Sequence, residues 1–190
     1  MKNTIILASN SPRRRDLLQQ IGWNFIVCPS KFEESSTASD PQALVLQNAL
    51  GKARDVAAHI EQGIVLGADT IVVHNGAVLS KPANKDEARS MLQQLAGDWH
   101  EVYTGVALVD SLTGREVSDV VCTRVHMRQL GAQELEDYLN TDEPYDKAGG
   151  YGIQGKAAVF VDRIDGCYFN VVGLPLSRLA KLVQQCAAWS

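Results

Sequence analysis

The chain has 190 residues, a formal net charge of −4 at pH 7 and an apolar content of 45%, which is ordinary for a globular protein with one sizeable core. The acidic balance argues against a protein that coats nucleic acid, because such binding depends on many phosphate contacts from a basic face. No apolar stretch approaches a membrane span and no signal peptide is evident, so we expect one cytoplasmic domain over residues 1–190 with no membrane partner.

The first fifteen residues predict a strand that leads directly into a helix. The apolar run Ile5–Ala8 is followed by Ser11 and Pro12, which are typical of an N-cap and a first helical residue. Arg13–Arg15 then fall in the first turn, where each cation opposes the helix dipole by roughly 0.3–1 kcal/mol. The hydroxyls of Ser9 and Ser11, the exposed N–H groups and the guanidinium groups together favour a phosphate-binding corner over the alternative of a solvated surface helix.

Apolar runs alternate with amphipathic stretches along the rest of the chain, which indicates an α/β fold built on a mixed sheet flanked by helices. Strands are expected at residues 24–28, 64–73, 77–79, 100–109, 116–125 and 157–164. Helices are expected from Pro41, after an Asn84 cap, over 132–140 and from Pro175. Tight turns are expected at Asn75-Gly76 and at Asp165-Gly166, the second leading by a hairpin into residues 167–172.

Asp69 interrupts an otherwise apolar run that should be largely buried. A buried carboxylate is costly unless it is paired, hydrogen-bonded or bound to a cation. One interpretation is a carboxylate that bonds local backbone or Thr70 at a bulge marked by Gly67. The functional interpretation is a metal ligand or a general base at the floor of a cleft.

Two acidic and two basic side chains are further candidates for this site. Glu33 and Glu34 follow a predicted strand, and together with Asp69 they offer the oxygen ligands that Mg²⁺ prefers. Lys52 projects from the middle of a predicted helix and Lys81 follows the hairpin after Asp69, where each would neutralise phosphate oxygens. Taken singly, each of these four residues is more commonly a solvated surface group. Mg²⁺ and Mn²⁺ both accept oxygen ligands, so the identity of the metal stays open.

The glycine-rich stretch 148–155 indicates close approach of the backbone to a flat or charged group. It is not a phosphate loop, because Ala157 stands where a Ser or Thr is required and a strand is expected to follow. Gln154 can both donate and accept hydrogen bonds, which suits the polar edge of a base, although an ordinary turn residue is the simpler interpretation. The cysteines and histidines of the chain show no zinc-ligand spacing.

Several blocks of the sequence closely resemble the Maf family of nucleoside triphosphate pyrophosphatases. They run in order from the first strand to the last helix: Leu7–Arg14, Gly67–Thr70, Lys81-Pro82, Asp146–Gly155 and Asn170–Pro175. The resemblance implies an elongated, two-lobed α/β fold similar to the inosine triphosphate pyrophosphatases, with a curved mixed sheet and a nucleotide cleft. It also implies hydrolysis of a nucleoside triphosphate to the monophosphate and pyrophosphate with a divalent cation.

Within the family, Lys-Ala-Gly followed by Tyr-Gly-Ile-Gln-Gly resembles the dTTP/UTP branch. This resemblance implies that Asp69 is the proton acceptor and that Arg13, Thr70 and Gln154 govern substrate choice. Ser9, Ser11, Arg14, Lys52 and Lys81 are the further expected substrate-binding residues, and Glu33 with Asp69 is the expected metal site.

The expected function is therefore removal of dTTP, UTP or modified pyrimidine nucleotides from the nucleotide pool. Two other functions stay open: a nucleotide-binding regulator of cell division that does not cleave, and a 7-methyl-GTP pyrophosphatase. A homodimer is also open, because nothing in the sequence fixes the oligomeric state.

Overall fold

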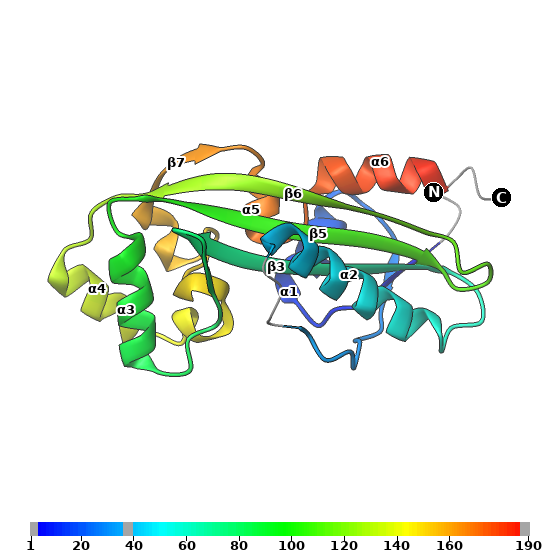
Figure 1. Cartoon of the computed structure of the whole chain (residues 1–190), viewed down its shortest axis with the longest axis horizontal. Coiled ribbons are helices and arrows are strands. Elements are labelled where there is room, and N and C mark those ends of the chain that lie inside the picture. Colours follow the sequence, from blue (N-terminus) through cyan, green and yellow to red (C-terminus); the bar gives the residue numbers. More distant parts are fainter. Residues whose placement is uncertain (1–3, 36–39, 187–190) are drawn as a thin grey trace. The chain divides into compact units, whose positions relative to one another are not determined.

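The computed structural model describes residues 4–35 and 40–186, and these form a mixed sheet with helices packed against it (Figure 1). The sheet has seven strands in the order β2-β1-β3-β5-β6-β7, with β4 paired to β3. The strands are β1 (Ile5–Leu7), β2 (Phe25–Val27), β3 (Ile64–His74), β4 (Ala77–Leu79), β5 (Trp99–Asp110), β6 (Glu116–Met127) and β7 (Val161–Asp165).

The helices are α1 (Pro12–Gln20), α2 (Pro41–Ala57), α3 (Lys85–Leu95), α4 (Ala132–Leu139), α5 (Tyr168–Val172) and α6 (Leu176–Cys186), with short 3₁₀ helices η1 (Glu143–Asp146), η2 (Ala148–Gly150) and η3 (Lys156–Phe160). The predicted α/β class and the mixed sheet flanked by helices are confirmed. None of the helices in the described ranges is long and apolar enough to cross a membrane.

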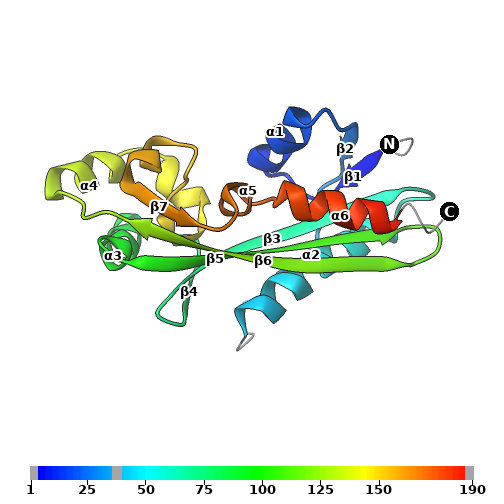
Figure 2. The same cartoon turned by 90° about the horizontal axis from the view of Figure 1, so that it is seen from above.

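The chain divides into two compact units, each of which uses part of the sheet. The first holds the residues up to Asp69, Thr104–Val121 and the residues from Gly173 onward, and the second holds Thr70–Tyr103 and Cys122–Val172. The expected single domain stays a prediction. In the first unit β1 pairs in parallel with β2 and β3. Helix α1 lies on one face of this part of the sheet and α2 on the other (Figure 2).

Helix α2 approaches the sheet closely because two strand positions facing it are glycines. A Cβ at Gly67 would lie 2.1 Å from the carbonyl oxygen of Ala49, and one at Gly105 would lie 2.3 Å from that of Val45. Gly67 therefore provides room for a helix, which differs from its predicted role as a bulge marker. The helix begins as predicted, since the Asp40 side chain accepts a hydrogen bond from the Gln42 N–H and Pro41 follows.

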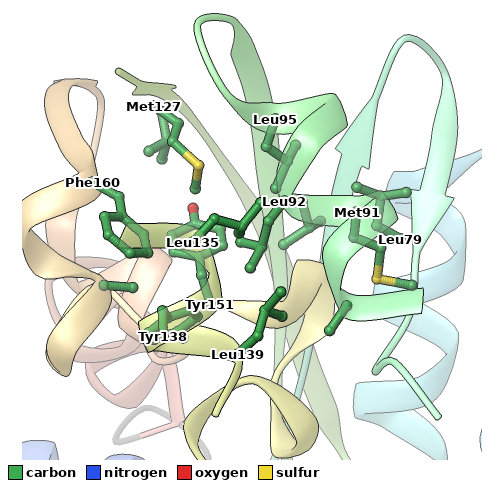
Figure 3. Packing of buried hydrophobic residues seen from close by; sticks show 14 of the residues in the cluster. Leu79, Met91, Leu92, Leu95, Met127, Leu135, Tyr138, Leu139, Tyr151 and Phe160 are labelled. Carbon is green, nitrogen blue, oxygen red and sulfur yellow. The ribbon is translucent and has the colours of Figure 1, made fainter. Parts of the chain in front are cut away.

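The core of the second unit gathers side chains from α3, α4, the end of β6 and the segment around η2 and η3 (Figure 3). Tyr138 packs edge-on against Phe160, with ring centroids 5.1 Å apart. The predicted Asn75-Gly76 turn is present, with both residues at positive φ, and joins β3 to β4 in antiparallel register. The predicted Asn84 cap is confirmed, because its side chain accepts from the Glu87 N–H at 2.9 Å.

His100 is a buried, titratable group in this core and makes stability depend on pH. It is 2% exposed, its Nε2 lies 2.6 Å from the Tyr151 hydroxyl, and burial lowers the pKa of His100 to about 4. Since an unfolded histidine titrates near 6.5, protonation favours the unfolded chain as pH falls from 6.5 toward 4.

We expect the titration of His100 to lower the free energy of unfolding by about 2–3 kcal/mol as the pH falls from 7.5 to 4.5. Urea denaturation of the wild type and of His100→Gln at both pH values measures it, with the variant losing that much less stability on acidification. An equal loss in both proteins would show that His100 does not carry the effect.

The predicted strand over residues 157–164 is wrong in its first half. Residues Lys156–Phe160 form the 3₁₀ helix η3, and only Val161–Asp165 forms a strand. The buried side chains Ala157 and Phe160 are three positions apart, which matches the period of a 3₁₀ helix rather than a strand. The Glu143 carboxylate accepts from the Lys156 N–H at 2.8 Å and holds the start of this helix.

The predicted hairpin at Asp165-Gly166 into residues 167–172 is also wrong, because Tyr168–Val172 forms helix α5. The side-chain amide of Asn170 donates to the Val102 carbonyl at 2.9 Å and to the Thr123 hydroxyl at 3.0 Å. The same hydroxyl accepts from the Cys167 N–H at 3.0 Å. These tertiary hydrogen bonds outweigh the strand propensity of the Val171-Val172 pair.

Candidate active site

Asp69 is the last residue of β3 that belongs to the first unit, and it is 6% exposed. Both of its carboxylate oxygens accept hydrogen bonds from helix α2. The Lys52 ammonium donates to Oδ1 at 2.7 Å, and the Asn48 amide donates to Oδ2 at 2.9 Å. Both carboxylate oxygens of Asp69 are therefore oriented by side chains of a single helix, α2.

Lys52 is a buried ammonium group shared by two carboxylates. Its Nζ lies 2.7 Å from Asp69 Oδ1 and 2.7 Å from Glu34 Oε1, and the Lys52 side chain is 10% exposed. Lys52 also lies 3.4 Å from the carbonyl oxygen of Ala68. The sequence predicted Lys52 as a partner of phosphate, and the structure adds that it forms ion pairs with both Asp69 and Glu34 within the protein.

The start of α1 forms the second part of the site. Arg14 donates through Nε to the Gly173 carbonyl at 2.9 Å and through Nη1 to the Ser9 hydroxyl at 3.1 Å. The Ser9 hydroxyl also accepts from the Ser11 N–H at 3.2 Å. Ser11 precedes the helix as predicted, but its side chain makes no capping hydrogen bond. Arg14 is thus held by Ser9, which follows β1, and by Gly173, which precedes α6.

The charges of the two parts act on the same guanidinium group. Burial is the largest influence on the pKa of Arg14 and makes the net shift downward, and the positive charge of Arg13 also lowers this pKa. The negative charges of Asp69 and Glu34 act in the opposite direction and raise it. Asp69 and Glu34 thereby supply within the chain negative charge that acts on Arg14, one of the arginines of the first turn. The cationic helix start and the buried carboxylate therefore belong to one electrostatic environment in the first unit.

The other predicted site residues divide between the two units. Arg13 is half-buried in the first turn of α1, and Glu33 is exposed beside Glu34. Thr70, Lys81 and Gln154 belong to the second unit, where Lys81 and Gln154 are exposed. The roles of these three residues toward a substrate stay predictions from the sequence.

The donor set near Asp69 fits a divalent cation that brings most of its ligands with a nucleotide. Among the residues that the structure describes, no group of three or more His, Cys, Asp or Glu side chains is arranged for a metal ion. Mg²⁺, however, commonly takes only one or two protein carboxylates and completes its shell with phosphates and water. Asp69 and Glu34, both bonded to the same ammonium, supply two carboxylates at one place.

Asn48 is a residue of this site that the sequence analysis missed. It is 2% exposed on α2, and besides Asp69 it contacts Ser35 through both ends of its amide. Asn48 and Lys52 are four positions apart, so they share one helix face. The sequence feature that could have identified Asn48 is its position one helical turn before Lys52, on the same face of the predicted helix.

Comparison with known proteins places the chain in a family. The family model described as Maf-like protein matches residues 4–186. A protein of Clostridium botulinum (strain 657 / Type Ba4) is 47% identical over 97% of both chains. A protein of Methanosarcina barkeri is 47% identical over 95% of this chain and 93% of the relative, and one of Carboxydothermus hydrogenoformans is 46% identical over 95% and 97%.

All three relatives are named dTTP/UTP pyrophosphatase. Among solved structures, the Staphylococcus aureus Ham1 protein is similar to 65% of this chain and 71% of its own length, with a TM-score of 0.46 and 13% identity. A family model that covers nearly the whole chain, together with full-length relatives at almost half identity, shows that this chain belongs to the Maf family.

Proposed function

We propose that this chain is a pyrophosphatase that hydrolyses dTTP and UTP to their monophosphates and pyrophosphate. The observation that carries the proposal is the buried Asp69 carboxylate, held by two donors from α2 and electrostatically coupled to the arginine at the start of α1. A buried base beside cationic groups is what cleavage of a phosphoanhydride requires. Membership of a family whose full-length relatives are named dTTP/UTP pyrophosphatase supports the choice of substrate.

In the proposed reaction a water molecule attacks the α-phosphorus of the triphosphate. A bond forms between the water oxygen and this phosphorus, and the bond from the phosphorus to the bridging oxygen of the β-phosphate breaks. Asp69 accepts the proton from the water, and pyrophosphate leaves with the bonding electron pair. Arg13, Arg14 and Lys52 offset the negative charge that builds on the phosphate oxygens.

We propose further that Asp69, with Glu34 or the neighbouring Glu33, would hold Mg²⁺ or Mn²⁺ when the nucleotide binds. Such an ion would neutralise phosphate charge and stabilise the pyrophosphate that leaves. In the protein alone Lys52 forms ion pairs with both Asp69 and Glu34, and its single positive charge leaves one negative charge for the cation to offset. The cytoplasmic location, the open possibility of a homodimer and the absence of a nucleic-acid partner stay predictions from the sequence.

A substrate panel tests the proposed function. The purified protein is incubated with Mg²⁺ and, separately, with dTTP, UTP, CTP and 7-methyl-GTP, and released pyrophosphate and nucleotide products are quantified. We expect dTTP and UTP to give the monophosphate and pyrophosphate in equal amounts, at a kcat/KM at least tenfold above that for 7-methyl-GTP. Tight binding without cleavage would favour a regulator, and preference for 7-methyl-GTP would favour the modified-purine enzyme.

A further inference from the structure

Residues 30–35, which we call the acidic loop because they include Glu33 and Glu34, are attached to one face of α2. The loop contacts four residues of this helix, which are Asn48, Gly51, Lys52 and Asp55. These positions follow the i, i+3, i+4, i+7 spacing of a single helix face. One stripe of the helix therefore serves as the attachment surface for the loop.

The end of the loop nearest β2 is held by Asp55 and by a glycine. Asp55 Oδ2 accepts from the Ser30 hydroxyl and from the Lys31 N–H, each at 2.7 Å. The Phe32 ring packs over Gly51, where a Cβ would lie 2.3 Å from the ring. These contacts fix the loop without touching Asp69.

Ser35, which directly follows Glu34, is held by Asn48, and this contact does reach the proposed base. Asn48 Oδ1 accepts from the Ser35 N–H at 2.9 Å, and Asn48 Nδ2 donates to the Ser35 carbonyl at 3.1 Å. The same Nδ2 donates to Asp69 Oδ2 at 2.9 Å. One buried amide group therefore binds the backbone of the acidic loop and the carboxylate of the strand simultaneously.

We propose that Asn48 is a positioning residue that couples the order of the acidic loop to the orientation of Asp69. The proposal rests on the proposed function, because it takes Asp69 as the base and the acidic loop as part of the same site. Only an amide has the required groups, since two contacts need an N–H donor and the third needs an acceptor. A carboxylate in its place would lose both donated bonds and put a like charge against Asp69.

Three variants on α2 test the proposal. Asn48→Ala removes all three hydrogen bonds, whereas Asn48→Asp keeps the acceptor for the Ser35 N–H and loses the two donated bonds, to Asp69 and to the Ser35 carbonyl. Asp55→Ala loosens the other end of the loop and leaves Asp69 untouched. Arg54→Ala is the matched control, because this residue is on the same helix and pairs with exposed Glu116 instead.

The readouts are kcat and KM for dTTP and the hydrogen exchange of the loop amides. Asn48→Asp is expected to lower kcat at least tenfold and to speed Ser35 exchange severalfold, because it loses the bonds to Asp69 and to the Ser35 carbonyl but keeps the acceptor for the Ser35 N–H. Asn48→Ala is expected to lower kcat as much and to speed that exchange tenfold or more. Asp55→Ala is expected to speed exchange at Lys31 and to change mainly KM, while Arg54→Ala matches the wild type.

The proposal is overturned if Asn48 variants that melt near the wild-type temperature keep kcat within threefold of it, or if Asp55→Ala lowers kcat as much as they do. Should Asn48→Ala fail to fold, Asn48→Asp decides the same comparison. The coupling also has a test that needs no activity, because coupling between two groups is reciprocal. Replacing Asp69 with Asn should speed Ser35 exchange severalfold, and unchanged exchange would refute the coupling even in a protein that does not cleave dTTP.

Discussion

Replacing Asp69 with Asn is expected to lower kcat for dTTP by about 10²–10⁴-fold, the range that general-base catalysis contributes. The variant keeps the shape of the side chain but cannot accept the proton of the attacking water. Binding of the triphosphate, measured without a divalent cation, should change little, because Arg13, Arg14 and Lys52 of the proposed phosphate site remain. Steady-state kinetics and direct nucleotide binding, measured side by side, separate the two effects.

The control for this prediction is Glu61→Gln, which removes an exposed carboxylate and should leave both kcat and nucleotide affinity unchanged. If Asp69→Asn turns over dTTP within threefold of the wild type, Asp69 is not the base. A loss of binding as large as the loss of turnover would instead give Asp69 a role in holding the substrate complex.

Replacing Lys52 with Met is expected to impair both folding and catalysis. The substitution leaves the buried Asp69 carboxylate without its ammonium partner and facing Glu34, and removing one member of a buried pair costs about 3 kcal/mol or more. It also removes a cation from the proposed phosphate site, with an expected loss of about 10²–10³ in kcat. Urea denaturation at pH 7 and steady-state kinetics measure the two losses.

A double variant separates these two effects of Lys52. In Lys52→Met with Asp69→Asn the buried negative charge is gone, so we expect most of the lost stability to return while kcat stays at or below that of Lys52→Met. Lys181→Met, an exposed lysine on α6, is the control for loss of a positive charge alone. A double variant no more stable than Lys52→Met would contradict the ion-pair explanation.

Patterns that are local in the sequence predicted most of the fold. The start of α2 was predictable because Asp40 and Pro41 are adjacent and act on the first turn alone. The β3–β4 turn was predictable for the same reason, since Asn75 and Gly76 adopt the positive φ angles that this turn type needs. Each of these features depends on residues only a few positions apart.

The errors in the fold came where distant residues decide the local structure. Helix α5 is held by hydrogen bonds from Asn170 to β5 and β6, and η3 begins where the Glu143 carboxylate binds its first N–H group. No window around residues 156–172 contains those partners. Local propensity alone therefore favoured strands in both segments.

The candidate site was predictable in its residue types but not in its pairings. Asp69 was identifiable because a carboxylate within an apolar strand demands a partner, and the partners turned out to be Lys52 and Asn48 from α2. The sequence analysis named Glu33 as the metal ligand beside Asp69, whereas the structure pairs the adjacent Glu34 with Lys52. That pairing depends on how the loop is attached to α2.

The most direct test of the proposed chemistry is to locate the solvent oxygen after hydrolysis of dTTP in ¹⁸O-labelled water. Mass spectrometry of the separated products shows which phosphorus atom the water attacked. Attack at the α-phosphorus, with Asp69 as the base, predicts the label in the thymidine monophosphate and none in the pyrophosphate. Label in the pyrophosphate, or formation of the diphosphate and inorganic phosphate, would contradict the mechanism.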